Sequence, residues 1–400
     1  MKSFFLNHII PIVLAISIVL IGLFFFDKLN STKIQDTNII IEGEQTKLKG
    51  RYGTILNHGD EGELNFMASM KNKSQLTIFG SSEFCDLNSI PYNFFPDSLG
   101  KQCLGIGHAY HQSLPILIEL LAAHVFNDSS EVCILISPGW FQHGGGTNSS
   151  AFIEFARPNF LDEILNNNDT PLEYKSYIGE YINTNSNNFN GLSKTMEQFI
   201  TLYKLKETNN ISPLIDEFIK EKITPNFSNT KAKNITYIPE LTYTESKKWD
   251  GNYTNILKTY QDNFISQIHN NKLYVNDDYY KNYLIDDSGE EKFVILNDVN
   301  FEINKEFRDF KKLVSYLKSR NMKASFVIIP FNPYYYRNTE IFLPLIDSLT
   351  TILDKNNLPC LNMYVTDTNN YEPGTLKDVM HLGDYGWMKV NEFIDSIYYK

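Results

Sequence analysis

Two short stretches near opposite ends of the 400-residue chain contain the side-chain types of a serine-type active site. In the later stretch, Asp378 precedes His381 by three residues, just ahead of a segment that predicts a helix. In the earlier stretch, a short apolar run ends in Gly80-Ser81-Ser82. A serine hydroxyl becomes a useful nucleophile when a histidine accepts its proton and a carboxylate fixes the tautomer of that histidine. The two stretches therefore predict nucleophilic chemistry by a serine, His381 and Asp378.

Each stretch also has a simpler interpretation. Ser81 or Ser82 could only cap a helix, with Glu83 in its first turn. A histidine considered alone is usually structural or exposed to solvent. The carboxylate of Asp378, three residues before His381 in a loop, is what favours a catalytic role for this histidine.

The remaining histidines and the cysteines give weaker signals. His108, His111 and His143 could line a cleft or bind a metal ion, but no carboxylate pattern accompanies them. The four cysteines show no metal-ligand spacing, and a disulfide between Cys85 and Cys103 is an open alternative outside the cytoplasm. There is no glycine-rich phosphate loop, so the sequence predicts neither a metal nor another cofactor.

Composition limits the class of protein. The formal net charge of -11 argues against nucleic acid as a general partner. Apolar residues make up 42% of the chain and aromatic residues 14%, which is enough to bury a large core.

The elements that would position these residues alternate between strands and helices. Apolar strand-like runs occur at 75–79, 132–136, 325–329 and 359–365. Helical spacing of apolar residues occurs at 112–126, 305–320, 339–353 and 386–398. Alternation of this kind predicts a parallel sheet covered by helices on both faces. The region of about 150–290 is rich in Asn, Tyr, Lys and Thr and has helical stretches near 196–206 and 213–222, so we interpret it as a helical insertion.

The beginning of the chain predicts a membrane anchor. Residues 9–26 carry no charge and read IIPIVLAISIVLIGLFFF. One helix needs roughly 20 apolar residues to cross a bilayer. The bulky end of this segment lacks the small-residue cleavage site of a signal peptide. We expect a cytoplasmic tail at 1–8, a transmembrane helix at 9–26, a polar stalk at 27–70 and an extracytoplasmic domain at 71–400.

Five motifs in order, together with the anchor, carry a resemblance to a known family. Gly80-Ser-Ser-Glu83 and Asp378-x-x-His381 resemble the pattern of the SGNH/GDSL hydrolases. More narrowly, the set resembles the DltD family of membrane-anchored proteins of teichoic-acid D-alanylation. The further matching segments are Phe84 after the first motif, Ser137-Pro-Gly-Trp-Phe141, Ile329-Pro-Phe-Asn332 with the tyrosines after it, and the Gly-x-x-Gly-Trp387 that follows His381.

The resemblance implies a fold and a role for each matching residue. The fold would be an SGNH-hydrolase-like, flavodoxin-like α/β sheet. Ser82 would be the nucleophile, His381 its base and Asp378 the residue that orients the base. The residues implied for the oxyanion hole or the cleft are the Ser82 N–H, Gly105 or Gly107, Trp140 and Asn332. Those considered for substrate recognition are Glu83, Phe141 and Tyr336; of these, Glu83 would suit the cation of a D-alanyl ester. The usual Gly-x-Asn-Asp block of the superfamily is replaced by the segment containing Trp140, so no Asn side chain is available from that block.

The implied activity is transfer of a D-alanyl group from a carrier to a cell-surface glycopolymer. Its partners would be a membrane-bound O-acyltransferase, the acyl carrier system and the polymer acceptor. Two alternatives stay open at this point. One is an esterase or O-acetyltransferase for another exopolysaccharide, and the other is a non-catalytic docking subunit.

Overall fold

The structure is a computed structural model of the chain, and it describes residues 75–84, 91–95, 102–107, 109–123, 130–207, 252–269, 271–297, 299–300 and 302–399. All of these belong to one compact unit, Lys47–Lys400. The predicted tail, anchor and stalk lie outside the described residues, so they stay predictions. Among the helices that are described, none has the length and apolar character needed to cross a membrane.

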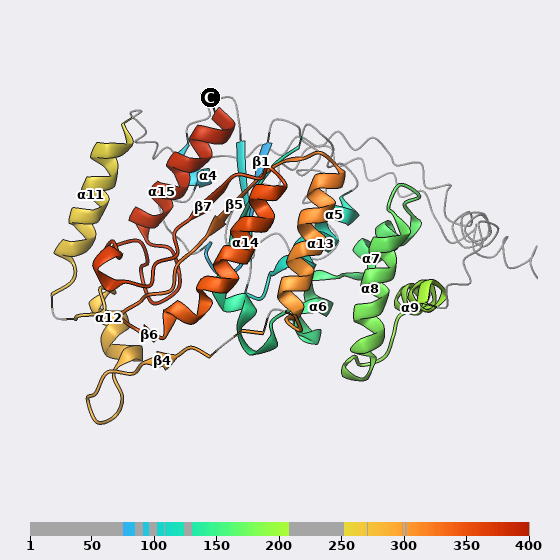
Figure 1. Cartoon of the computed structure of the whole chain (residues 1–400), viewed down its shortest axis with the longest axis horizontal. Helices are drawn as coiled ribbons and strands as arrows, with labels where there is room; N and C mark the ends of the chain where they lie inside the picture. Colours follow the sequence, from blue (N-terminus) through green and yellow to red (C-terminus); the bar gives the residue numbers. More distant parts are fainter. Residues whose placement is uncertain are drawn as a thin grey trace, which may run out of the picture. The chain divides into compact units, whose positions relative to one another are not determined.

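A five-stranded parallel sheet forms the centre of this unit (Figure 1). Its strand order is β2-β1-β3-β5-β7. The strands are β1 (Gln75–Gly80), β2 (Gln102–Gly107), β3 (Glu131–Ile136), β5 (Lys323–Ile328) and β7 (Cys360–Asn362). The first strand in sequence therefore lies inside the sheet, and the chain reverses its direction of winding between β1 and β3. This is the order of the flavodoxin-like doubly wound fold.

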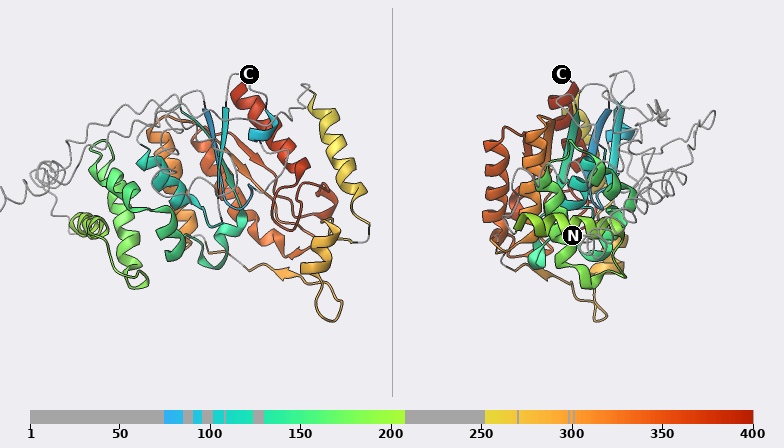
Figure 2. Two further views of the ribbon diagram at one scale, coloured as in Figure 1. Left: turned by 180° about the vertical axis from the view of Figure 1, so that it is seen from behind. Right: turned by 90° about the vertical axis from the view of Figure 1, so that its right-hand side faces the viewer.

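Helices cover both faces of the sheet (Figures 1 and 2). Side chains of successive strand residues point to opposite faces, so Ile134 belongs to one apolar cluster and its neighbour Leu135 to the other. The first face packs against α5 (Ser113–Ala122), α13 (Lys305–Ser319) and α14 (Leu343–Lys355). The second packs against α15 (Asp384–Ile394) and α4 (Pro91–Phe94). The prediction of a parallel sheet between two helical layers is confirmed.

Short elements connect these layers. A two-stranded parallel pair is formed by β4 (Val294–Ile295) and β6 (Tyr336–Arg337). The short helical turns are η3 (Pro138–Gly144), η4 (Ser186–Asn188), η7 (Tyr280–Leu284), η8 (Thr339–Phe342), η9 (Thr368–Asn370) and η10 (Asp395–Tyr399).

The strand β2 is the main difference from the sequence prediction. Its sequence, QCLGIG, contains two glycines, which are depleted in strands and are more typical of loops. The strand nevertheless pairs with β1 along its whole length, with Gly105 opposite Ile78 and Gly107 opposite Gly80. Tertiary pairing therefore overrides the local preference.

The region of about 150–290 is mostly helical where it is described. It contains α6 (Ser149–Phe155), α7 (Pro158–Asn166), α8 (Leu172–Thr184), α9 (Lys194–Glu207), α11 (Tyr253–Ser266) and α12 (Asp277–Tyr279). The helix predicted at 213–222 lies outside the described residues. The helices α8 and α9 pack closely because Gly179 has no side chain: a Cβ there would lie 2.0 Å from the carbonyl oxygen of Phe199.

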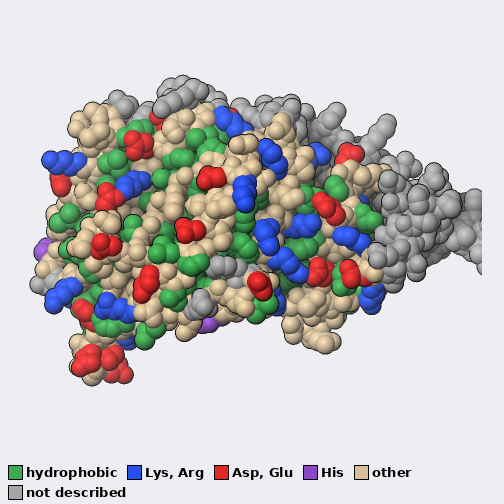
Figure 3. Space-filling model, in the orientation of Figure 1, with side chains coloured by type: hydrophobic (Ala, Val, Ile, Leu, Met, Phe, Trp, Pro, Cys, Tyr) green, Lys and Arg blue, Asp and Glu red, His purple; other side chains and the backbone are tan. Residues whose placement is uncertain are grey.

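Charges are mixed over the face of the molecule seen in Figure 3. Lysine and arginine side chains alternate there with aspartate and glutamate. Acidic side chains gather at the protruding loop between η7 and β4, where Asp286, Asp287 and Glu290 are exposed.

Gly107 should be the most sensitive glycine at the carboxyl end of the sheet. A Cβ there would lie 2.7 Å from the carbonyl oxygen of Ser81 and 2.9 Å from that of Gly80, and backbone atoms cannot move away cheaply. We expect Gly107→Ala to lower the free energy of unfolding by about 1–3 kcal/mol, the usual cost of overpacking. Denaturant titration followed by circular dichroism measures this change.

Gly139→Ala is the matched control for that substitution. Its Cβ would lie 3.3 Å from the Ser137 side-chain oxygen, which can shift. Equal stability of the two variants would contradict the close approach seen at Gly107.

Candidate active site

The nucleophile turn, residues 80–84, follows β1 directly. Ser81 is buried, whereas Ser82 is partly exposed at the carboxyl end of the sheet. The backbone N–H of Ser81 donates to the Glu83 carboxylate at 2.5 Å. The turn therefore places the Ser82 side chain toward solvent while its neighbours are packed inward.

The acid–base loop, residues 375–383, lies between β7 and α15. Its two sides pair in antiparallel fashion through Leu376 and Leu382, and the Lys377 N–H donates to the His381 carbonyl at 2.9 Å. At the tip, one Asp378 oxygen accepts the backbone N–H groups of Met380 (2.9 Å) and His381 (2.8 Å). The three-residue spacing between acid and base is thus the span of one tight turn.

The structure brings Ser82, His381 and Asp378 into one line of hydrogen bonds. His381 Nε2 lies 2.9 Å from Ser82 Oγ, and His381 Nδ1 lies 2.8 Å from Asp378 Oδ2. An ionised carboxylate can only accept, so Nδ1 is the donor to Asp378. In the neutral imidazole, Nε2 is then left to accept the Ser82 hydroxyl proton. This is the arrangement that a serine nucleophile requires.

Electrostatics in this line favour the charged forms of the acid and the base. Burial alone would lower the pKa of His381, but the hydrogen bond and negative charge of Asp378 outweigh it and raise that pKa above its usual value. Burial would raise the pKa of Asp378, yet its bonds to His381 and to the loop N–H groups hold it below the usual range. Asp378 is therefore poised to stabilise an imidazolium as it forms.

The position of the three residues agrees with the topology. In doubly wound sheets, ligands bind beyond the carboxyl ends of the strands, where the winding direction reverses. Here the reversal lies between β1 and β3. Ser82 follows β1, and the turn η3 follows β3 at the same edge.

Asn332 has a different place from the one that the sequence predicts. Its side chain is fully buried, its amide nitrogen donates to the Leu273 carbonyl at 2.7 Å, and its oxygen accepts the Tyr334 N–H at 2.9 Å. Its backbone N–H donates to the Val379 carbonyl at 3.1 Å, inside the acid–base loop. Asn332 therefore anchors this loop to the end of β5, and its buried side chain does not face a ligand. An Asn just after Pro330-Phe331 is typical of a turn that its side chain stabilises, and this sequence pattern could have indicated the structural role of Asn332.

The segment after β3 also differs from its predicted role. The Trp140 N–H donates to the Ser137 carbonyl at 3.1 Å, and the Gly139 N–H donates to the Ser137 hydroxyl at 3.2 Å. Trp140 is thus no ready oxyanion donor. The Phe141 side chain is fully buried in the core, so it does not face a substrate. Both aromatics serve packing, because a turn directly after a buried strand remains against the core.

Tyr336 and the two predicted glycines are likewise structural. Tyr336 is 5% exposed and packs on Phe331, with ring centroids 4.5 Å apart. Gly105 lies within β2 and is paired with Ile78, whereas Gly107 lies at the strand end, beneath the nucleophile turn. Of these three residues, only Gly107 contacts the turn.

Glu83 and the other histidines considered in the sequence differ in their exposure to solvent. Glu83 is 2% exposed, and burial raises its pKa, so its carboxylate is engaged within the turn instead of facing a ligand. His111 is buried beside the turn, and His143 is exposed with a left-handed backbone (φ 52°). His108 and Cys85 lie outside the described residues. Cys103 is a thiol whose sulfur lies 2.9 Å from the Tyr399 hydroxyl oxygen, so the structure does not show the disulfide considered between Cys85 and Cys103. Within the described ranges, no three metal-binding side chains gather.

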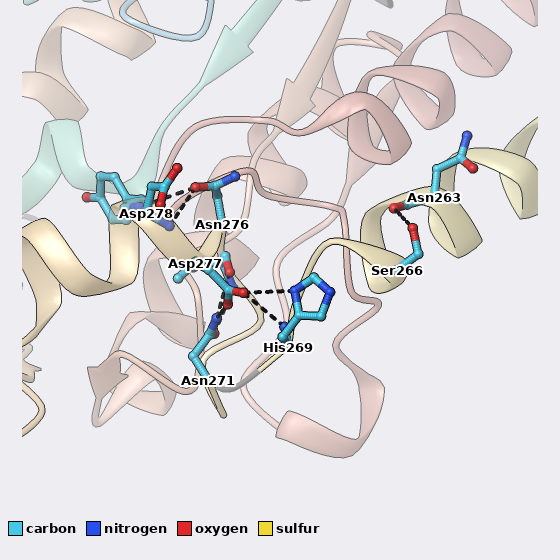
Figure 4. A network of polar contacts seen from close by, with 9 residues as sticks. Asn263, Ser266, His269, Asn271, Asn276, Asp277 and Asp278 are labelled. Atoms are coloured by element: carbon cyan, nitrogen blue, oxygen red, sulfur yellow. Dashed lines mark hydrogen bonds and ion pairs between the residues drawn. The ribbon is translucent and has the colours of Figure 1, made fainter.

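The loop between α11 and α12, whose polar contacts are drawn in Figure 4, is hydrogen-bonded to the acid–base loop. His269 and Asn271 both point to the Asp277 carboxylate, at 3.1 Å and 2.7 Å. The Asn276 N–H then donates to the Lys377 carbonyl at 3.4 Å. Next to this loop is a cavity of about 350 Å³, lined by Ile265, Ile268, His269, Asn271, Lys272, Tyr274 and Tyr334.

Comparison with known proteins identifies relatives over most of the chain. The family model described as "DltD protein" matches residues 58–399. Protein DltD of Bacillus subtilis (strain 168) is 22% identical over 342 residues, which cover 82% of this chain and 83% of that protein.

The pKa of His381 gives a direct test of the Asp378 interaction. We expect a pKa above the usual 6.5, and we expect Asp378→Asn to lower it, because burial then acts without the opposing carboxylate. Carbon–proton NMR of labelled histidine rings across a pH series measures both values, and His381→Ala assigns the signal. An unchanged pKa in Asp378→Asn would show that the two side chains are not coupled in solution.

Proposed function

The chain belongs to the DltD family, which is linked to D-alanylation of teichoic acids, and we propose that it transfers an acyl group through Ser82 during modification of a cell-surface polymer. The observation that carries this proposal is the line of hydrogen bonds from Ser82 through His381 to Asp378. Ser82 and His381 are 299 positions apart in the sequence, so local packing does not explain why they are hydrogen-bonded.

The proposed reaction has two halves. Ser82 Oγ attacks the carbonyl carbon of an acyl thioester or ester while His381 Nε2 takes the hydroxyl proton. The tetrahedral intermediate collapses, His381 returns that proton to the departing thiol or alcohol, and an acyl-serine ester remains. A hydroxyl of the acceptor then attacks this ester with His381 again as base. The acyl group leaves on the acceptor, and Ser82 recovers its proton.

The negative oxygen of each intermediate needs donors. The Ser82 backbone N–H is our candidate, since it lies in the tight turn at the end of β1, next to the attacking oxygen. Asn332 and Trp140, whose groups are engaged elsewhere, are not part of this proposal.

We further propose a place and partners for the reaction. The uncharged segment 9–26 would anchor the chain, with the catalytic domain outside the cytoplasm. An acyl carrier system and a membrane-bound O-acyltransferase would supply the acyl group, and a glycopolymer would accept it. The cavity beside the loop between α11 and α12 suits a phosphate-bearing polyol chain, because Lys272 can pair with phosphate and Tyr274 and Tyr334 offer ring faces.

The alternatives differ in what they require of the triad. An esterase or O-acetyltransferase for another polysaccharide would use the same three residues on another acyl group. A docking subunit would not need Ser82 to meet His381. The hydrogen-bonded arrangement therefore favours an enzyme over a docking subunit.

Covalent labelling tests the activated serine. The full-length chain in detergent is treated with a fluorophosphonate and read by intact mass. We expect one adduct on the wild type and a loss of labelling rate on the order of 10³-fold or more in His381→Ala, because the base is gone. Ser82→Ala should abolish labelling, whereas Ser81→Ala serves as the matched control and should retain it. Labelling that persists in Ser82→Ala would contradict the assignment of Ser82 as the nucleophile.

The identity of the acyl group needs a second experiment. The protein is incubated with D-alanyl and acetyl thioesters of a carrier phosphopantetheine arm, quenched with acid and analysed by mass spectrometry. We expect an alanyl ester on Ser82 that forms at least tenfold faster than the acetyl ester, a margin of about 1.4 kcal/mol. Faster acetyl transfer would support the O-acetyltransferase alternative.

A further inference from the structure

The peptide group between Gly80 and Ser81 is held from both sides by buried ionisable side chains. Its oxygen, the Gly80 carbonyl, lies 2.9 Å from His111 Nδ1. Its N–H, that of Ser81, donates to Glu83 at 2.5 Å. This peptide group immediately precedes the one that carries the Ser82 N–H. Its orientation therefore sets the direction of the next peptide and of the Ser82 side chain.

His111 itself is fixed by a second buried residue. His111 Nε2 lies 3.0 Å from Glu119 Oε2 in α5, and both side chains are 0% exposed. The imidazole also packs between aromatic rings, 4.8 Å from Phe155 and 6.1 Å from Phe79 between centroids. Neither translation nor rotation of the ring is free.

Hydrogen-bonding rules show which group carries the proton between His111 and the Gly80 carbonyl. A carbonyl oxygen can only accept, so His111 Nδ1 must carry a hydrogen. The contact between Nε2 and Glu119 contains one further hydrogen, on either the ring or the carboxyl. In both cases the pair has no net charge, which makes its complete burial affordable in a medium where a bare carboxylate would cost several kcal/mol. In both cases Glu119 holds the His111 ring in the orientation that keeps Nδ1 at the Gly80 carbonyl.

Steric contact completes the constraint. The missing side chain of Gly107 lets β2 approach the carbonyls of both Gly80 and Ser81. The turn is therefore confined by a hydrogen bond to its oxygen, a hydrogen bond from its nitrogen, and backbone packed below it.

We propose that His111, held by Glu119, is a positioning residue for the nucleophile turn: it keeps the Gly80–Ser81 peptide in the orientation that presents Ser82 to His381. The inference rests on the proposed function, in which Ser82 reacts. It adds a buried His–Glu pair that does not touch the acyl group. Glu119 is the one acidic residue in the apolar helix SLPILIELLA, a pattern that suggests a buried partner.

The test compares two replacements of His111 that differ in one donor. Asn places an amide nitrogen near the position of imidazole Nδ1, whereas Leu has a similar size and no donor. Both are made in a Glu119→Gln background, so that no bare carboxylate is left buried. The readouts are the two constants of fluorophosphonate labelling, the reagent affinity and the maximal inactivation rate.

We expect the Leu variant to lose on the order of 10²-fold in the maximal rate with unchanged affinity, since small displacements of a reacting group have costs of that size. The Asn variant should stay within about threefold of the background, because it restores the donor. A purely structural role predicts equal losses in both variants or a loss of affinity, and either result would overturn the proposal.

Hydrogen exchange of the peptide covering 79–84 gives a readout that does not need chemistry. Faster exchange in the Leu variant than in the Asn variant is expected, and equal exchange would count against the positioning role even if the variants label differently. If the wild type is not labelled at all, the proposed acyl-transfer function fails, and the exchange comparison still decides whether His111 orders the turn. Near-ultraviolet circular dichroism of each variant verifies that it is folded.

Discussion

The site depends on the close approach of two strand ends that only a glycine allows. Gly107 at the end of β2 lies directly beneath the carbonyls of Gly80 and Ser81. A Cβ there would lie 2.7 Å from the Ser81 carbonyl oxygen and 2.9 Å from that of Gly80, so the turn or the strand would have to shift. Because the strands are parallel, the same edge also receives the loop after β7, which delivers His381. The geometry of the site therefore depends on close packing between two backbone segments.

Each buried acidic side chain around the turn has a polar partner. Three carboxylates, those of Glu83, Glu119 and Asp378, lie buried within or against the elements that meet there. Each has a defined partner: the Ser81 N–H, His111 and His381. A buried polar group without a partner destabilises the folded state, so these contacts are needed for the fold.

The sequence predicted the strands and the acid–base spacing of this site better than the roles of the polar and aromatic residues around them. Buried strands such as β3 and β5 are continuous apolar runs, and the Asp378 to His381 spacing is a local pattern, so both could be recognised. Whether a polar side chain such as Asn332 faces a cleft or the interior depends on partners far away in sequence, here Leu273 and Val379. The same limit explains the roles expected for Trp140, Phe141 and Tyr336. The strand β2 was not predicted because its glycines lower its strand propensity. One of them, Gly107, is needed for the close approach to the nucleophile turn.

The acid and the base share one small loop, whereas the nucleophile comes from a distant part of the chain. During synthesis from the N-terminus, Ser82 emerges 299 residues before His381. Until the acid–base loop has docked on Asn332, the serine is an ordinary hydroxyl with no base beside it. If Ser82 reacts as proposed, a half-made or partly unfolded chain would therefore be inactive, and only the completed fold would activate the serine.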